Sequence, residues 1–158
     1  MNIAQRQKLM LALGQALQQK PDIVQKAIIR AKFENQWFTH ESIEQAINAI
    51  CQNYLQANQL ATWLKAYPLK EIEKPKTVGI VMAGNIPLVG FHDFLSVFMS
   101  GHKAQVKLSS KDKVLFTAIS ELLYEIDPLA KDYLEISERL HNFDAVIATG
   151  SNNSARYF

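Results

Sequence analysis

A change of hydrophobic pattern near residue 77 constrains the fold of this chain most strongly. From there on, short apolar runs with no polar face alternate with segments of helical spacing. The expected strands cover residues 78–82, 104–108, 133–136 and 145–148, and the expected helices cover residues 87–100 and 113–126. Strands that alternate with helices of this length pair in parallel through right-handed crossovers. This half of the chain therefore predicts an α/β fold with a parallel sheet.

The first half has the pattern of amphipathic helices. Before residue 67 the apolar residues recur at helical spacing, as in Val24, Ala27, Ile28 and Ala31. Pro21 suits the first turn of one helix, and Thr39 suits the cap of the next. We expect three or four helices in this half.

Residues 67–77 are typical of an exposed connector, because they contain two prolines and alternating charges. The predicted organisation is a helical N-terminal segment at residues 1–66, the connector at 67–77, and an incomplete βαβ domain at 78–158. With 158 residues, 48% of them hydrophobic, the chain can close one core with a helical appendage. Residues 152–158 start a helical pattern without a stop signal, so we expect the chain to end within an element.

Charge and composition argue against several classes of partner. Charged residues make up 20% of the chain, the formal net charge is +2, and the basic residues are spread along the sequence. Nucleic acid and anionic membranes are therefore poorly supported. The longest apolar stretch, residues 86–99, is interrupted by His92 and Asp93 and is too short to span a membrane. A single cysteine, Cys51, and no signal-peptide pattern predict a cytoplasmic protein.

The turn after the first strand, residues 83–87, is the best candidate for a binding site. It is expected to place backbone donors and a helix start at the carboxyl edge of a parallel sheet, where ligands bind. Neither the dinucleotide pattern G-x-G-x-x-G nor the P-loop pattern occurs. Asn85 has two interpretations: a turn or cap residue, or a donor amide whose direction Pro87 fixes.

Three ordered blocks resemble one protein family. Residues 79–95 read GIVMAGNIPLVGFHDFL, residues 106–112 read VKLSSKD, and residues 148–153 read ATGSNN. Together they resemble the LuxC-like acyl-CoA reductases of the aldehyde dehydrogenase superfamily. The resemblance covers residues 76–158 strongly and the helical half loosely. It implies a partial Rossmann-like sheet of the aldehyde dehydrogenase type, and reduction of a long-chain acyl-CoA or acyl-protein thioester by NADPH to a fatty aldehyde through an acyl-cysteine intermediate.

The resemblance also implies roles for individual residues. Asn85 matches a donor to the thioester oxygen, Lys107 a lysine that contacts the adenosine ribose, and Ser151 a serine that faces the pyrophosphate. Ser110 stands where many NAD-preferring relatives carry a glutamate, so an NADPH preference is expected. The expected cofactor contacts are Ala83, Gly84, Lys107, Ser109, Ser110, Lys111, Gly150 and Ser151. The alternative is that these are ordinary exposed loop residues.

The sequence departs from the family in lacking a nucleophile. The catalytic cysteine and the substrate-binding lobe are expected beyond Phe158, so this chain is expected to be inactive alone. Cys51 follows apolar residues on a predicted helix and is expected to be a buried structural residue. Faces left uncovered by a missing lobe predict a homo-oligomer. A non-catalytic nucleotide-binding or interaction module is the alternative function.

Histidines offer no clear chemistry. His40, His102 and His141 are far apart and have no cysteine or carboxylate at ligand spacing, so no metal site is expected. His92 and Asp93 are adjacent on a predicted helix and point in different directions, so spacing alone does not pair them. Neither of these two residues receives a role from the sequence.

Overall fold

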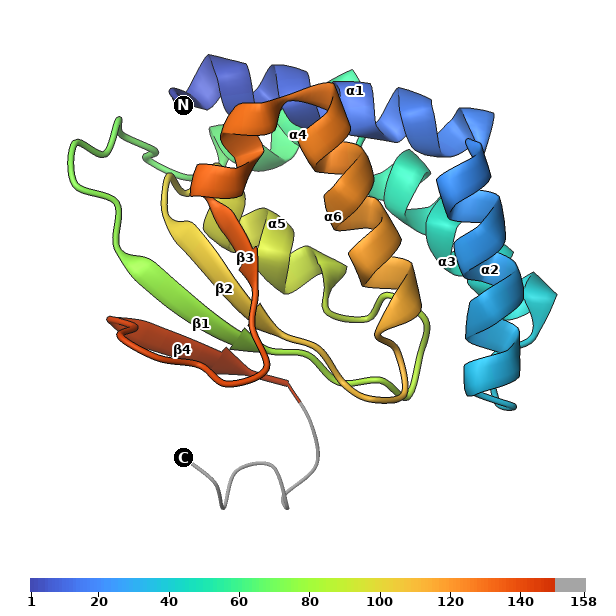
Figure 1. Cartoon of the computed structure of the whole chain (residues 1–158). Helices are drawn as coiled ribbons and strands as arrows, with labels where there is room; N and C mark the ends of the chain where they lie inside the picture. Colours follow the sequence, from blue (N-terminus) through green and yellow to red (C-terminus); the bar gives the residue numbers. More distant parts are fainter. Residues whose placement is uncertain (150–158) are drawn as a thin grey trace.

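A computed structural model describes residues 1–149 as an α/β fold, which confirms the predicted fold class. Four strands form one all-parallel sheet: β1 (Thr77–Val81), β2 (Lys103–Lys107), β3 (Leu134–Ile136) and β4 (Ala145–Ala148). Their spatial order is β3-β2-β1-β4, which is the order of the first four strands of a Rossmann sheet (Figure 1). The predicted strands agree with the observed ones to within a residue at either end.

The helical half contains α1 (Ile3–Gln19), α2 (Asp22–Glu34), α3 (His40–Asn53) and α4 (Ala57–Lys65). Local capping explains where two of them begin. The Asn2 side chain accepts from the Gln5 N–H, and the Gln5 side chain returns a bond to the Asn2 N–H. Thr39 caps α3 as predicted, by accepting from the Ser42 N–H at 3.0 Å. Pro21 lies at the N-cap of α2, one residue before the helix.

Two helices connect the first three strands. They are α5 (Phe91–Met99), between β1 and β2, and α6 (Val114–Ile126), which is followed by a 3-10 turn η1 (Pro128–Asp132) before β3. Because the chain moves from β1 to β2 to β3 in one direction, right-handed crossovers place both helices on the same face of the sheet. Gly101, with φ +92°, follows the end of α5, as predicted.

The helical half packs against α5 and α6 and shares their hydrophobic core (Figure 1). α1 contacts both α5 and α6, and α2 contacts α6. Arg6 of α1 is almost completely buried, donates to the Phe98 carbonyl at 2.5 Å, and stacks 4.2 Å from the Tyr133 ring centroid. Residues 66–76, which lie between α4 and β1, contain no helix or strand.

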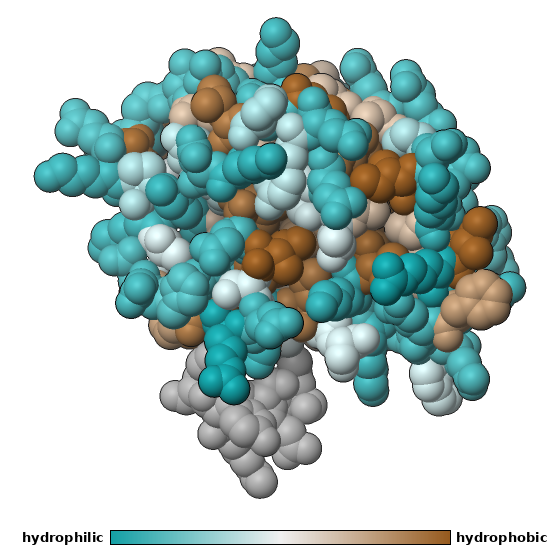
Figure 2. All heavy atoms as spheres, in the orientation of Figure 1, coloured by the Kyte–Doolittle hydropathy of each residue, from teal (hydrophilic) through white to brown (hydrophobic). Residues whose placement is uncertain are grey.

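The opposite face of the sheet is crossed by the β3–β4 connection, residues 137–144, which contains no helix. Leu140 lies over Gly79 of β1, where a Cβ would come 2.8 Å from the Leu140 Cδ1. Gly79 therefore makes room for the connection to lie flat on the sheet. Figure 2 shows that hydrophilic side chains cover most of the visible surface, with separate apolar patches between them. Of the helices in the described part of the chain, none has the length and apolar content needed to cross a bilayer.

Candidate functional site

The carboxyl ends of β1 and β2 lie side by side and carry most of the residues selected from the sequence. Val81 pairs with Lys107 in the ladder, and the Met82 N–H donates to the Lys107 carbonyl at 3.1 Å. The next strand, β4, pairs with the other side of β1, so the strand order reverses at β1. In open α/β sheets the crevice at such a reversal is where ligands bind.

The turn after β1 is longer than predicted. The sequence predicted a helix from Pro87, but α5 begins at Phe91, with Gly90 as its N-cap. Leu88 explains the difference, because its φ of 58° is left-handed and cannot belong to an α-helix. The expectation that Pro87 starts the helix, and that the turn sits directly on a helix N-terminus, is therefore wrong.

Asn85 is exposed in this turn, and its side chain has no hydrogen-bond partner among residues 1–149. The helix cap is Gly90 and the left-handed residue is Leu88, so Asn85 performs neither of the structural tasks that would explain an asparagine here. Its amide is free to donate to a ligand. That is the property required of an oxyanion donor.

Asp112 holds the turn in place and was not selected from the sequence. It lies in the loop after β2, is 7% exposed, and accepts the Leu88 N–H on Oδ2 at 2.6 Å. Its Oδ1 is buried and has no partner among the described residues. Burial raises the pKa of Asp112 to about 6, and the hydrogen bond from Leu88 offsets part of that rise. Asp112 lies inside the second family-like block, which was the only sign of its importance.

Gly84 brings the two loops into contact. A Cβ on Gly84 would collide with the Ser109 side chain and approach Lys111 Cβ at 3.1 Å. Ser109 is half-buried, and its Oγ accepts from the Lys111 N–H at 3.2 Å, so this hydroxyl stabilises its own turn. Ala83 is half-buried beside them. The structure therefore places Ala83, Gly84, Ser109 and Lys111 close together.

Three polar side chains remain exposed along this edge: Lys107, Ser110 and Lys111. In the part of the chain that the structure describes, none of these side chains has a hydrogen-bond or ion-pair partner. The stretch from Lys107 to Lys111 contains no acidic residue. An anionic group approaching it meets two cations and a hydroxyl donor.

Asn35 connects this edge to the helical half. It follows α2, is 7% exposed, and donates its amide N–H to the Lys111 carbonyl at 3.1 Å. Asn35 was not identified from the sequence, where it resembles an ordinary residue after a helix. The contact spans 76 positions of the chain, so no local pattern contains it.

The adjacent residues His92 and Asp93 have separate structural partners. The Asp93 carboxylate accepts from the Thr149 hydroxyl at 2.6 Å, which ties α5 to the residue after β4. The His92 ring lies 5.3 Å from Tyr54 and 5.9 Å from Trp63, between centroids, and lines a hollow of 270 Å³ between α4 and α5. These contacts assign the two residues to packing between elements.

Cys51 is buried, and burial raises its pKa to about 11. A thiol with this pKa is protonated at neutral pH and is a poor nucleophile. Within residues 1–149, no three His, Cys, Asp or Glu side chains gather closely enough to hold a metal ion. Two expected cofactor contacts, Gly150 and Ser151, lie outside the described residues.

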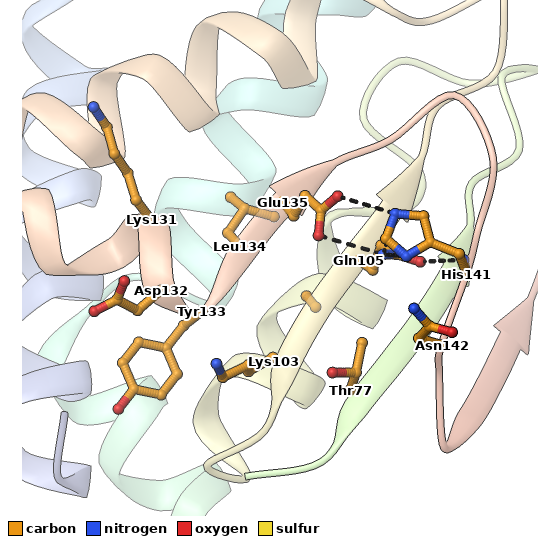
Figure 3. A pocket seen from close by; sticks show the side chains of 11 residues that line it. Thr77, Lys103, Gln105, Lys131, Asp132, Tyr133, Leu134, Glu135, His141 and Asn142 are labelled. Carbon is orange, nitrogen blue, oxygen red and sulfur yellow. Dashed lines mark hydrogen bonds and ion pairs between the residues drawn. The ribbon is translucent and has the colours of Figure 1, made fainter.

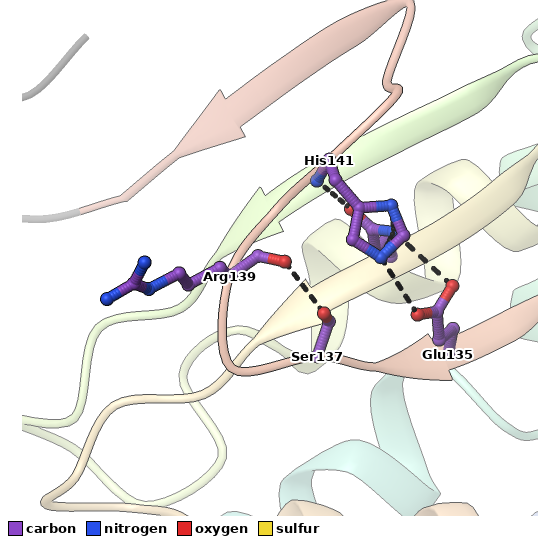
Figure 4. A network of polar contacts seen from close by, with 5 residues as sticks. Glu135, Ser137, Arg139 and His141 are labelled. Carbon is purple, nitrogen blue, oxygen red and sulfur yellow. Dashed lines mark hydrogen bonds and ion pairs between the residues drawn. The ribbon is translucent and has the colours of Figure 1, made fainter.

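A polar hollow of 390 Å³ lies at the opposite, amino-terminal end of the sheet (Figure 3). Its walls include Lys103, Lys131 and Glu135. The Gln105 side chain accepts the His141 N–H at 2.8 Å and points its amide at Glu135, 3.3 Å away. Figure 4 shows the contacts of the β3–β4 connection: the His141 ring faces Glu135 of β3, and the Ser137 hydroxyl donates to the Arg139 carbonyl. Gln105, Glu135 and His141 are therefore engaged with one another, whereas the side chains of Lys103 and Lys131 have no hydrogen-bond or ion-pair partner among residues 1–149.

No protein-family model matches the chain, and comparison with curated proteins gives no match. The resemblance to LuxC-like acyl-CoA reductases therefore stays a prediction that rests on the three sequence blocks.

Proposed function

We propose that this chain is the N-terminal cofactor-binding portion of a LuxC-like acyl-CoA reductase, which reduces a long-chain acyl thioester to the fatty aldehyde with NADPH. The observation that carries the proposal is that the turn of Asn85 lies against the Lys107–Lys111 loop, through Gly84, at the sheet edge where the strand order reverses. Two different family-like blocks supply these two loops. Their contact through Gly84 supports the view that they serve one site.

The exposed side chains of this edge suit the adenosine end of NADPH. Lys107, Ser110 and Lys111 offer positive charge and a donor for a ribose 2′-phosphate. Asp112, the nearest acid in this loop, is turned inward to Leu88. Gly84 lets the backbones of the two loops approach closely, a fit that a Cβ would remove. When bound, NADPH would supply the hydride for the reduction.

Asn85 would act on the substrate. Its free amide is proposed to donate to the thioester oxygen as negative charge develops there, which lowers the barrier to attack and reduction. The attacking thiolate is not Cys51, because that thiol is buried with a pKa of about 11. The proposal therefore requires a nucleophilic cysteine from outside these 158 residues.

A second candidate function is a non-catalytic nucleotide-binding or interaction module. The burial of Cys51, the only cysteine of the chain, favours it. The reading frame of the gene separates the two candidates. A cysteine in a glycine-rich context within about 150 to 200 residues of further coding sequence, the size of another domain, supports the reductase. A stop codon directly after Phe158 supports the module.

Titration with NADPH and NADH tests the cofactor site directly. We expect NADPH to bind more tightly, and Lys107→Ala to weaken NADPH binding about tenfold, because one charge-assisted hydrogen bond is lost. Lys103→Ala is the matched control, since Lys103 is an exposed lysine at the other end of the same strand. Equal affinities for the two nucleotides would contradict the proposed NADPH preference. If neither nucleotide bound, the proposed cofactor site would be wrong.

A further inference from the structure

A row of large apolar side chains protrudes from α2 and from the turn after it. Ile29 is 60% exposed, Phe33 82% and Trp37 87%. Ile29 and Phe33 are four residues apart, so they lie on one face of the helix. Figure 2 shows apolar side chains standing out at the margin of the molecule that α2 forms in Figure 1. We call these three residues the α2 apolar row.

Lysines border the α2 apolar row on both sides. Lys26 and Lys32 are exposed and lie on opposite sides of the row around the helix. Arg30 donates to Glu34 at 2.6 Å, so this pair adds no net charge. Asp22, in the first turn, is the other acid of α2 and lies one turn before Lys26, on the same face as Ile29 and Phe33. The three basic residues Lys26, Arg30 and Lys32 and the two acids Asp22 and Glu34 give α2 a net charge of +1 around the apolar row.

Hydrogen bonds through Asn35 hold the turn that carries Trp37. The Trp37 N–H donates to Oδ1 of Asn35 at 3.0 Å, and Asn35 is itself anchored to the Lys111 carbonyl. On the other side, Phe38 is 1% exposed and its N–H donates to the Asn35 carbonyl at 2.9 Å. Trp37 thus points outward between two buried residues. Its exposure results from the packing of its neighbours.

We propose that the α2 apolar row docks the protein on the surface of an anionic lipid bilayer. An apolar helix face with lysines on its borders is the arrangement of helices that lie in the membrane interface. Tryptophan favours the headgroup level, and lysines near the surface are attracted to anionic lipids. A protein partner typically requires a complementary patch of about 800 Å² on each side. Three separate protruding side chains suit insertion between headgroups better.

The sequence did not predict this surface, because the basic residues are spread along the chain and argued against binding to anionic membranes. The helix brings Lys26 and Lys32 to the borders of one apolar row, and burial of the opposite face leaves that row outward. The proposal is independent of the proposed reductase activity. A membrane surface would nonetheless be a suitable place to collect a long-chain acyl substrate or release an aldehyde.

Flotation with phosphatidylcholine vesicles, with and without phosphatidylglycerol, tests the proposal. We expect the protein to float with vesicles that contain phosphatidylglycerol and to be released by salt. Phe33→Ser and Trp37→Ser should each weaken binding about tenfold, because an apolar side chain no longer enters the interface. Lys26→Gln with Lys32→Gln should remove the preference for phosphatidylglycerol. Leu129→Ser, which alters a residue of η1 that is 53% exposed, is the matched control and should bind like the wild type.

Fluorescence and light scattering add independent readouts. Trp63→Phe leaves Trp37 as the only tryptophan, and its emission should shift to the blue with anionic vesicles. Failure of the wild type to float, or flotation of the Phe33→Ser/Trp37→Ser variant at the wild-type level, would overturn the proposal. A dimer in light scattering that this double variant converts to a monomer would instead assign the row to a second copy.

Discussion

The two ends of the sheet differ in the hydrogen bonding of their central polar side chains. At the amino-terminal end, Gln105, Glu135 and His141 bond to one another and fasten the β3–β4 connection. At the carboxyl edge, Asn85 and Lys107 extend into solvent without a partner among residues 1–149. The amino-terminal end has the 390 Å³ hollow, yet Gln105, Glu135 and His141 in its wall are already bonded to one another. Free donors beside a strand-order reversal are therefore a better guide to a site here than hollow volume.

Substitution of Asn85 is the strongest test of whether the free donors at the carboxyl edge form the functional site. In the complete enzyme of the proposal, Asn85→Ala should lower the rate of aldehyde formation by about 10²–10³, equivalent to about 2.7–4 kcal/mol, because an oxyanion donor is lost. Stability should be unchanged, since Asn85 is exposed and forms no hydrogen bond within the described residues. Kinetics with acyl-CoA and NADPH measure the rate of aldehyde formation, and thermal unfolding checks that stability is unchanged. Full activity of the variant would exclude the oxyanion role.

Asp112 provides a test of stability at the same edge. Its pKa rises from 3.8 in the unfolded chain to about 6 in the folded protein, so the folded state binds more protons between these values. The free energy of unfolding should therefore fall as pH rises from about 4 to about 6, by about 2–3 kcal/mol from this group. Urea unfolding across this pH range measures the slope.

Asp112→Asn is the control for that slope. The amide oxygen can still accept the Leu88 N–H, but the side chain no longer titrates. The fall in stability between pH 4 and pH 6 should therefore shrink by the contribution of this carboxyl. An identical slope in the variant would show that other groups cause it.

The sequence predicted the sheet well because its signals are local. Apolar runs of strand length and their spacing located all four strands, and Thr39 marked the start of α3. The start of α5 was misplaced by four residues, because the left-handed Leu88 is held by Asp112 from a different loop. Asn35 was also missed, because its partner, the Lys111 carbonyl, lies 76 positions away in the chain. Side chains that act on distant backbone leave no periodic trace in the sequence.

Substitutions in the amino-terminal network should have only small effects on stability and should leave NADPH binding unchanged. Gln105→Ala should cost about 1 kcal/mol of stability, because the His141 N–H loses its acceptor, and should speed hydrogen exchange of that amide. Glu135→Gln should cost less than about 0.5 kcal/mol, since the 3.6 Å contact with His141 joins two side chains that are more than half exposed. Neither change should affect NADPH binding. Weaker binding in either variant would mean that both ends of the sheet contribute to the cofactor site, and that Gln105 and Glu135 serve function although they are bonded to other residues.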